Sequence, residues 1–212
     1  MKLYSYFRSS ASYRLRIALN LKGLTYDYQA LNLLAGQQQS EEYLALNPLG
    51  LVPTLQLDNG EILIQSSAVL EYLEESYPQP PLLPADALAR ARVRAIANAI
   101  ACEIQPLCNI GVTEHLKASF DIGSDEVFAW YNRWMPRGFT AVEHMLQEAG
   151  TAFASGDAPG MADVFLVPQV YNARRFKVAL DAFPKLVAIV DRCNEMQAFQ
   201  DAAPEAQPDA TT

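Results

Sequence analysis

Serine hydroxyls and arginine guanidinium groups are crowded into one short segment, "RSSASYRLR" (residues 8–16), directly after the first apolar run of the chain. Ser9 and Ser10 stand where the alternation of a strand gives way to helical spacing, which predicts that they lie at a helix N-terminus. The free N–H groups and the positive dipole end of a helix favour an anion, and serine hydroxyls add donors. A thiolate is an anion that would profit from this arrangement.

A helix N-terminus with serine donors would lower the pKa of such a thiol. A free thiol has a pKa of about 8.5. A charge-assisted hydrogen bond contributes about 1.5–3 kcal/mol and the dipole about 0.3–1 kcal/mol more, which together lower the thiol pKa by about one to two units. Because the segment contains no cysteine, the thiol must come from a bound ligand. The alternative interpretation is that the serines are plain helix caps, and that Arg14 and Arg16 are surface or ion-pairing residues.

Composition excludes several classes of function. The 212 residues are half apolar and carry a formal charge of −8, which argues against nucleic acid as a main partner because phosphate binding needs a basic field. The three cysteines form no CxxC pair and only two histidines are present, so neither a zinc site nor a dithiol redox pair is expected. No signal peptide or membrane-spanning run is recognisable, and we expect a cytoplasmic protein.

The pattern of the first 79 residues predicts an α/β domain. Strands and helices are indicated in the order βαβαββα, over residues 2–6, 9–22, 25–33, 40–48, 54–58, 61–64 and 66–77. Asn59-Gly60 is a strong hairpin signal between the last two strands. Ser66 is predicted to cap the helix that closes this domain.

The rest of the chain has a different character. The prolines of "YPQPPLLP" interrupt helix and sheet, and predict a linker over residues 80–86. Apolar residues beyond it follow helical spacing, which predicts an all-α domain over residues 87–212. The tail "APEAQPDATT" (203–212) is expected to be mobile.

Several motifs resemble the zeta-class glutathione transferases, the maleylacetoacetate isomerases, and the related maleylpyruvate isomerases. They occur in order along the whole chain: "RSSASYRLRIAL", "NPLGLVPTL", "QSSAVLEYLEE", "LLPAD", "IQPL", "GDAPGMADVFLVPQVYNARRF" and "AFQDAAPEAQPDA". The resemblance implies a thioredoxin-like domain that binds glutathione, followed by an all-helical domain that contributes the acceptor site. It also implies a homodimer.

The resemblance assigns roles to residues of the first domain. Ser9 corresponds to the serine that hydrogen-bonds the glutathione sulfur, with Ser10 beside it. The other glutathione contacts that it implies are a loop glutamine near the glycyl end, a backbone partner of the cysteinyl part with a cis proline after it, and a pair that holds the γ-glutamyl carboxylate: Gln38, Val52, Pro53, Gln65 and Ser66.

Family substrates are dicarboxylates or keto-dicarboxylates with a cis double bond, so positive charge is needed beside the thiolate. Arg8 precedes the serines, and Arg175 matches the family's arginine at the substrate-anion site. A guanidinium group suits this role because its fork pairs a carboxylate with two hydrogen bonds. Arg174 is interpreted as a surface residue. Weaker candidates for the substrate pocket are Gln105, Cys108 and Asn109.

Three departures from the family pattern matter. Ala11 stands where the family often has cysteine, so chemistry that needs a protein thiol is not expected there. Cys108 stands where a polar amide is common, and is interpreted as a small buried hydrophobe. Gly160 stands where serine or threonine usually caps a helix, and Asp163 is expected to act there as a structural helper.

The resemblance implies glutathione-dependent cis–trans isomerisation of maleylacetoacetate to fumarylacetoacetate, a step of tyrosine and phenylalanine catabolism. The motif "IQPL" and the lack of a basic residue after Asn109 favour this substrate over maleylpyruvate of gentisate catabolism. Other interpretations are a general glutathione transferase or peroxidase, and a non-catalytic interaction module of the same fold. Glutathione is the expected cofactor, a small acidic keto-acid the expected substrate, and no metal is expected.

Overall fold

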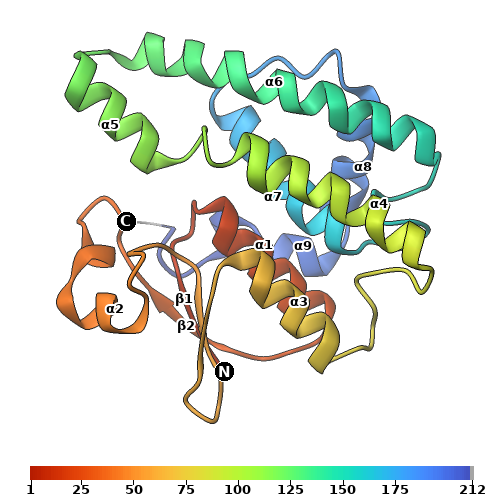
Figure 1. Cartoon of the computed structure of the whole chain (residues 1–212), viewed down its shortest axis with the longest axis horizontal. Coiled ribbons are helices and arrows are strands. Elements are labelled where there is room, and N and C mark those ends of the chain that lie inside the picture. The colour runs from red at the N-terminus through yellow and green to blue at the C-terminus, as the bar shows by residue number, and fades with distance from the viewer. Residues whose placement is uncertain (211–212) are drawn as a thin grey trace. The chain divides into compact units, whose positions relative to one another are not determined.

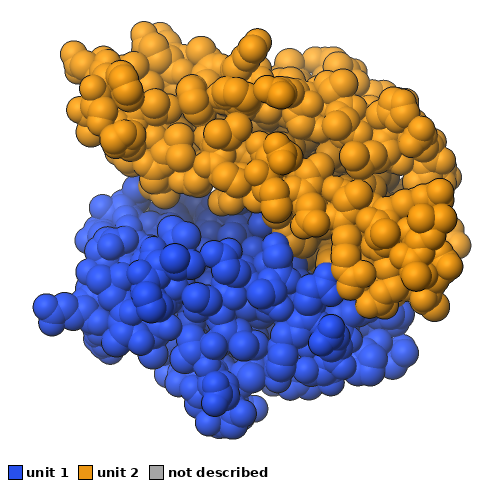
Figure 2. Space-filling view, in the orientation of Figure 1, with its two compact units in different colours: residues 1–82, 195–212 blue, residues 83–194 orange. Residues whose placement is uncertain are grey.

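The structure, a computed structural model, describes residues 1–210 and divides the chain into two compact units. Unit 1 contains Met1–Leu82 together with the chain from Glu195 onward, and unit 2 contains Leu83–Asn194 (Figure 2). The sequence assigned residues 87–212 to a single helical domain, whereas the segment after Asn194 belongs to the first unit. Within residues 1–210 no helix is long and apolar enough to cross a membrane.

Unit 1 is built on a four-stranded sheet with the order β2-β1-β3-β4. The strands are β1 (Lys2–Ser5), β2 (Asp27–Ala30), β3 (Thr54–Gln56) and β4 (Ile62–Ile64). β1 pairs with β2 in parallel, and the other two pairings are antiparallel. The hairpin between β3 and β4 turns at Gly60, whose φ of 89° is readily adopted only by glycine.

The helices of unit 1 complete the predicted order βαβαββα, which is confirmed. They are α1 (Ser10–Leu21), the 3₁₀ turn η1 (Gln37–Gln39), α2 (Glu41–Leu46) and α3 (Ser66–Ser76). α1 and α3 pack side by side, as Figure 1 shows. Their buried apolar residues and those of the central strands form the core: Leu3, Leu15, Ile17, Leu19, Leu55, Val69, Leu70 and Leu73.

The part of the alternative interpretation that places Arg14 and Arg16 on the surface is wrong. Both side chains are buried, and Arg16 is 0% exposed. Arg16 donates to the carbonyl oxygens of Ala202 and Phe7 and to the hydroxyl of Ser5. Burial lowers the pKa of its guanidinium. The spacing of apolar residues in α1 did not predict the burial of Arg16. Its acceptors lie outside the helix, so they have no effect on the helix's own sequence pattern.

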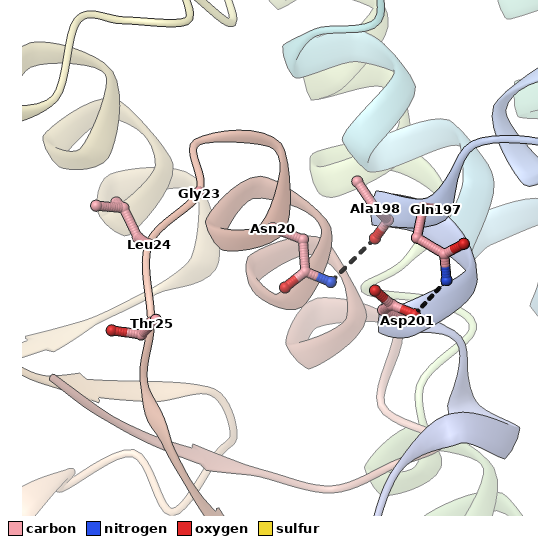
Figure 3. A pocket seen from close by; sticks show the side chains of 7 residues that line it. All are labelled: Asn20, Gly23, Leu24, Thr25, Gln197, Ala198 and Asp201. Carbon is pink, nitrogen blue, oxygen red and sulfur yellow. Dashed lines mark hydrogen bonds between the residues drawn. The ribbon is translucent and has the colours of Figure 1, made fainter.

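The C-terminal segment packs against α1 instead of being a mobile tail. It forms α9 (Gln197–Ala202), in which Phe199 and Ala202 are both 0% exposed. Within the predicted tail it forms the 3₁₀ turn η3 (Pro204–Ala206), and Pro204 and Gln207 are buried. Asn20 of α1 donates to the carbonyl oxygen of Ala198 beside a shallow surface pocket (Figure 3). The last two residues of the predicted tail lie outside the described residues.

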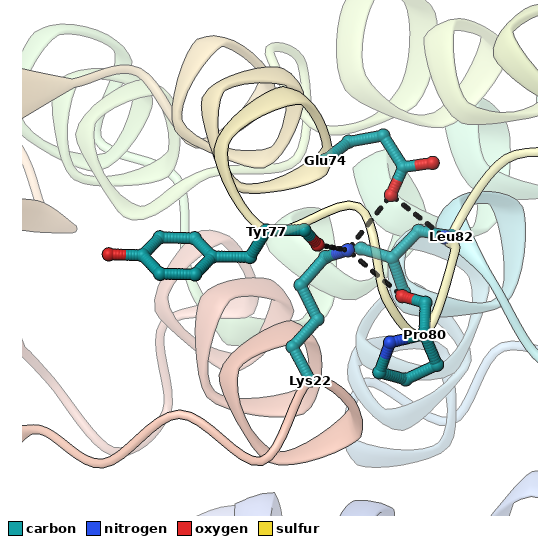
Figure 4. Close-up of polar contacts among 5 residues, drawn as sticks. All are labelled: Lys22, Glu74, Tyr77, Pro80 and Leu82. Carbon is teal, nitrogen blue, oxygen red and sulfur yellow. Dashed lines mark hydrogen bonds and ion pairs between the residues drawn. The ribbon is translucent and has the colours of Figure 1, made fainter.

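A buried ion pair fixes the exit from α3. Lys22 Nζ lies 2.9 Å from Glu74 Oε2, and the side chain of Lys22 is 0% exposed. Lys22 also donates to the carbonyl oxygens of Tyr77 and Pro80, while Glu74 accepts the backbone N–H of Leu82 (Figure 4). The proline-rich segment between α3 and Leu82 is thereby held to Lys22 at the end of α1 and to Glu74 of α3.

Unit 2 is helical, as predicted for this part of the chain. Its helices are α4 (Ala87–Asn98), the π-helical turn η2 (Ala99–Ile104), α5 (Ile110–Phe120), α6 (Ser124–Ala149), α7 (Met161–Arg175) and α8 (Pro184–Asn194). α7 is the central helix, since nearly all of its residues are buried. α6 approaches η2 closely at Gly138, where a Cβ atom would overlap the side chain of Ile104.

The N-terminus of α7 confirms the role expected for Asp163 and adds a residue that was missed. The Asp163 carboxylate is 0% exposed and accepts the backbone N–H groups of Ala154, Ser155 and Gly160. Gly160 has no hydroxyl to cap the helix, and Ser155 Oγ accepts the N–H of Ala162 at 2.9 Å in its place. The loop before the helix therefore supplies the missing cap.

Candidate active site

Sheet topology brings the predicted glutathione-binding residues of unit 1 to one edge. β1 and β2 are parallel, and β3 is antiparallel to β1, so the chain leaves β1 and β2 at the edge where it enters β3. β4 runs antiparallel to β3 and ends at that edge as well. The residues that follow or precede these four strand ends are the predicted ones: Ser9, Gln38, Val52, Pro53, Gln65 and Ser66.

Ser9 is the N-cap of α1, as both interpretations of the sequence require. Its Oγ accepts the backbone N–H of Ser12 at 3.2 Å. Capping uses a lone pair of the hydroxyl, so its O–H remains available to donate to an anion. No acidic residue lies in the first turn of α1. Ser9 can therefore cap the helix and stabilise a thiolate at the same time.

The neighbours of Ser9 differ in accessibility. Ser10 is the first residue of α1 and is buried, at 8% exposure. Arg8 is exposed, and its guanidinium carbon lies 4.7 Å from the centre of the Phe7 ring. A cation held over an aromatic face in this way remains free to bind a carboxylate.

The N-terminus of α3 has no side-chain cap. The helix begins at Ser66 with Gln65 at the N-cap position, so the prediction that Ser66 caps this helix is wrong by one residue. Gln65 has a φ of 68°, a left-handed value that costs a non-glycine residue free energy and that concentrates at ligand-binding positions. The first turn of α3 contains no acidic side chain, so its N–H groups can donate hydrogen bonds to a carboxylate ligand.

Arg14 adds positive charge beside this helix end. Its Nη1 donates to Ser66 Oγ at 3.3 Å within the interior of unit 1. The contact joins the second turn of α1 to the first residue of α3. Sequence reasoning missed Arg14 because a residue inside an amphipathic helix carries no signal of a partner 52 positions away.

The segment before β3 presents backbone atoms at the same edge. The Val52–Pro53 peptide bond is cis, as the resemblance implied. Pairing between β1 and β3 begins at Thr54, so the backbone of Val52 lies just beyond the ladder. Tyr43 Oη and Asn47 Nδ2 both donate to the carbonyl oxygen of Leu51, at 2.6 and 2.7 Å.

Tyr43 and Asn47 are positioning residues that the sequence did not reveal. Both are buried, and both also contact Thr54 Oγ1 at the start of β3. Burial raises the pKa of the Tyr43 hydroxyl, so it stays protonated and remains a donor. The sequence placed both residues in a predicted helix over residues 40–48, and that local pattern does not predict the bonds of Asn47 to Leu51 and Thr54.

Gln38 lies in η1 and has an unusual side-chain environment. Its Oε1 atom is buried and accepts no hydrogen bond from the residues that the structure describes. A buried acceptor without a donor costs about 1–3 kcal/mol. A ligand N–H group would satisfy it, which fits the part that the resemblance gives to Gln38.

Unit 2 carries the predicted acceptor residues, and two adjacent arginines differ in their partners. Arg174 Nη2 lies 2.7 Å from Asp191 Oδ1, in an exposed ion pair. Arg175 has no carboxylate partner among residues 1–210, and its guanidinium carbon lies 4.9 Å from the centre of the Phe176 ring. Phe176 in turn stacks on Tyr131, with ring centroids 3.8 Å apart. Arg175 is therefore the arginine that can receive an anion.

The weaker pocket candidates of unit 2 have mainly structural environments. Cys108 is 3% exposed, and burial raises the pKa of its thiol to about 12, so it is a protonated, apolar side chain at neutral pH. Asn109 caps α5 by accepting the N–H of Val112 and donates to the carbonyl oxygen of Pro106. Gln105 is half-buried at the end of η2.

The fold of each unit and the cis proline at the sheet edge define a protein of the glutathione transferase class. The family model described as "Glutathione S-transferase, N-terminal domain" matches residues 8–76, and the one described as "Glutathione S-transferase, C-terminal domain" matches residues 122–200. The maleylacetoacetate isomerase of Pseudomonas aeruginosa PAO1 is 49% identical over 211 residues, which cover 99% of this chain and 98% of the relative.

Solved structures agree with the sequence comparison. A holo maleylpyruvate isomerase, described as a bacterial zeta-class glutathione transferase, superposes with a TM-score of 0.96 at 46% identity and 99% coverage of both chains. A maleylacetoacetate isomerase from Methylobacterium extorquens AM1 with bound malonate and glutathione gives a TM-score of 0.94 at 35% identity and 98% coverage of both chains. The chain belongs to the zeta class of the glutathione transferase family, which confirms the resemblance and the predicted fold class.

Proposed function

We propose that the protein is an enzyme that uses glutathione to isomerise maleylacetoacetate to fumarylacetoacetate. Relatives with this activity in their names match the chain over nearly its full length. The observation that carries the proposal is the convergence at one sheet edge of a capping serine with a free O–H, a cis proline and an uncapped helix N-terminus. These features fit a thiol peptide that carries a carboxylate.

Each residue has a chemical role in this proposal. When bound, glutathione supplies a thiolate that adds reversibly to the conjugated double bond and so permits rotation about it. Ser9 donates its hydroxyl hydrogen to the sulfur and, with the dipole of α1, lowers the thiol pKa. Ser10 is the neighbouring donor in the first turn. The γ-glutamyl carboxylate binds at Gln65 and Ser66.

The remaining contacts hold the thiol peptide and the substrate. The backbone of Val52 before cis Pro53 pairs with the cysteinyl part, and Gln38 Oε1 accepts an N–H near the glycyl end. Arg8 and Arg175 bind the carboxylates and the keto oxygen, where negative charge develops in the transition state. Gln105, Cys108 and Asn109 form part of the acceptor wall in this proposal.

Maleylpyruvate is the second candidate substrate. A maleylpyruvate isomerase superposes on this chain with a TM-score of 0.96. Both compounds are cis-configured keto-acids with terminal carboxylates, so the same thiolate and arginines serve either. The assay below includes both.

We also propose that the enzyme is a cytoplasmic homodimer. The support for a dimer is apolar surface on unit 1, where Leu34, Leu49 and Leu51 are 69%, 51% and 57% exposed. Their burial against a second copy would be favourable by about 25 cal/mol per Å². Light scattering of the purified protein measures the mass directly.

The test of the proposed function is an absorbance assay on maleylacetone, an analogue of maleylacetoacetate, and on maleylpyruvate, with and without glutathione. Turnover should require glutathione and should fall by about 10²–10³-fold in Ser9→Ala, in line with the loss of one donor to a reacting anion. Ser119→Ala, at an exposed serine of α5, is the matched control.

The outcomes are distinct. The better substrate identifies the reaction. Glutathione binding without turnover on either compound excludes the isomerase and leaves a general transferase or peroxidase. Absence of glutathione binding leaves a non-catalytic module of this fold.

A further inference from the structure

The loop that presents Ser9 is a tight turn held by its own backbone. The N–H of Ser9 donates to the carbonyl oxygen of Tyr6 at 2.9 Å, which places Phe7 and Arg8 at the two central positions. In such a turn the N–H and C=O groups of the first central residue are not used by the turn itself. Both of these groups of Phe7 need partners from elsewhere.

Partners reach Phe7 from two sides. Arg16 Nη2 donates to the carbonyl oxygen of Phe7 at 3.0 Å. The backbone N–H of Phe7 donates to Asp209 Oδ2 at 3.1 Å, over a separation of 202 residues. A cation and a carboxylate thus hold the two backbone groups of one residue, two positions before Ser9.

Asp209 is itself fixed in place. Its Oδ1 accepts the hydroxyl hydrogen of Tyr28 at 2.7 Å. Tyr28 is a residue of β2, which pairs with β1. Arg16 also donates to the carbonyl oxygen of Ala202, which holds the same C-terminal segment. Ala210 packs against the apolar cluster of Tyr6, Phe7, Tyr43 and Val52. The segment therefore touches the supports of both Ser9 and Val52.

We propose that Asp209 is a positioning residue for the reaction, and that the C-terminal segment acts as a brace behind the Ser9 turn. By holding the N–H of Phe7, Asp209 sets the orientation of the turn and hence the direction in which the Ser9 hydroxyl points. This inference rests on the proposed function, because it concerns the sulfur that Ser9 would contact.

The pKa of the bound thiol and the affinity for the peptide should respond differently to loss of Asp209, whereas a general loss of structure would change both. The γ-glutamyl site at Gln65 and Ser66 is attached to α3, and neither residue contacts Asp209 in the hydrogen bonds described above. Ala210 still packs beside Val52 when only the Asp209 side chain is changed. Loss of the Asp209 carboxylate alone should therefore weaken thiolate stabilisation while leaving the affinity for the peptide nearly unchanged.

The experiment compares Asp209→Ala, Asp209→Asn and the wild-type protein. The pKa of the bound glutathione thiol is read from the ultraviolet absorbance of the thiolate, and affinity from S-methylglutathione, which has no ionisable thiol. Asp209→Ala should raise the bound thiol pKa by about one unit and lower kcat by about tenfold, because misplacements near 1 Å cost up to about 10²-fold. The Kd for S-methylglutathione should change by less than about twofold.

Asp209→Asn should restore most of both values, since its amide oxygen can still accept the N–H of Phe7 and its NH₂ group can donate to Tyr28. Asp201→Asn is the matched control, because Asp201 is an exposed carboxylate of the same segment that accepts from Gln197. It should leave all three quantities at the wild-type values.

Three results would overturn the inference. One is an unchanged thiol pKa and kcat in folded Asp209→Ala, and another is an affinity for S-methylglutathione that falls in parallel with kcat. If Asp209→Ala does not fold, Tyr28→Phe takes its place, because it removes one hydrogen bond to the Asp209 carboxylate. It should shift the thiol pKa and kcat in the same direction by a smaller amount. The third refuting result is no shift in Tyr28→Phe. A wild-type protein that does not lower the thiol pKa refutes the proposed function instead.

Discussion

Two neighbouring side chains of the same type at the end of α7 have different environments. Arg174 is committed to Asp191, whereas Arg175 lies against the Phe176 ring and has no carboxylate partner among the described residues. A guanidinium group without an internal counter-ion is available to a ligand. Availability, and not residue type, distinguishes the two.

Substitution of each arginine tests this distinction. Arg175→Ala should lower kcat/KM for the maleyl substrate by about 10- to 100-fold, which corresponds to the loss of one charge-assisted interaction of about 1.5–3 kcal/mol. Arg174→Ala should leave kcat/KM nearly unchanged and alter the free energy of unfolding by less than about 1 kcal/mol, because its ion pair is exposed. Steady-state kinetics on both variants measures the difference, and equal losses would contradict the assignment.

At the residue scale, sequence reasoning succeeded where a motif names both a residue and its backbone setting. Ser9 at the start of α1 and the cis bond before Pro53 are examples. It failed for Arg14 and Arg16, whose partners Ser66 and Ala202 lie on other elements. Such pairs depend on the packing of the finished fold, which no local pattern contains.

Among the elements, α7 shows how a helix end can be completed by a neighbouring loop. Asp163 accepts three backbone N–H groups, and Ser155 supplies the hydroxyl that Gly160 lacks. The sequence indicated that Asp163 would help, because it stands at the third helical position. The contribution of Ser155 could not be predicted, since it depends on how residues 151–159 fold back over the helix.

The two residues should differ in their effect on stability. Asp163→Ala leaves three N–H groups without their acceptor and should lower the free energy of unfolding by at least about 3 kcal/mol. Ser155→Ala removes one capping bond and should cost about 1 kcal/mol. Urea unfolding measures both, and an Asp163→Ala variant no less stable than Ser155→Ala would show that the carboxylate bonds are not the main support of this helix end.

The Lys22–Glu74 pair makes a second prediction for an element, the chain that follows α3. Lys22→Met leaves the Glu74 carboxylate buried without this cation and should cost about 3–5 kcal/mol. Lys117→Met, which removes the exposed Lys117–Glu114 pair, is the control and should cost about 0.5 kcal/mol or less.

The double variant Lys22→Met/Glu74→Gln sharpens the test of this ion pair. Because it removes both charges together, it should be less destabilised than the sum of the two single variants. Chemical denaturation of all four proteins gives the coupling free energy. A sum that matches the double variant would mean that the pair contributes through packing alone.

For the whole molecule, several tyrosine and cysteine side chains that are buried or partly buried and have raised pKa values contribute to the response to alkali. Burial raises the pKa of Tyr131 and of Cys108 to about 12, and it also raises the pKa of Tyr26, Tyr28 and Tyr43. In the folded protein these groups keep their protons at pH values where the unfolded chain loses them. Their neutral forms therefore stabilise the fold only while the pH stays below the ordinary pKa of each group.

The sign of the pH dependence follows from proton binding. Above about pH 9 for cysteine and pH 10 for tyrosine the folded state binds more protons than the unfolded state, so the free energy of unfolding falls as the pH rises. Thermal melts between pH 7 and 11 should show a Tm that is steady at first and then declines. Tyr131→Phe should decline less steeply above pH 10, and a slope equal to that of the wild type would refute the contribution of Tyr131.

Prediction at this largest scale was good for the order of elements and poor for the end of the chain. The hairpin at Asn59-Gly60 and the change of character after the prolines were visible in local patterns. The return of the C-terminal segment to unit 1 was not, because short polar stretches with proline and glutamine are also typical of mobile tails.

That return has a consequence for how the protein is made. A chain emerges from the ribosome from its N-terminus, and domains generally fold as they are completed. In unit 1, however, Arg16 donates to the carbonyl oxygen of Ala202, and the N–H of Phe7 donates to Asp209. Neither hydrogen bond can form until these late residues have been synthesised. Arg16 and Phe7 thus reach their final environment only after the chain has been made as far as Asp209, and a nascent polypeptide interrupted before Gln200 would hold residues 8–16 without these partners.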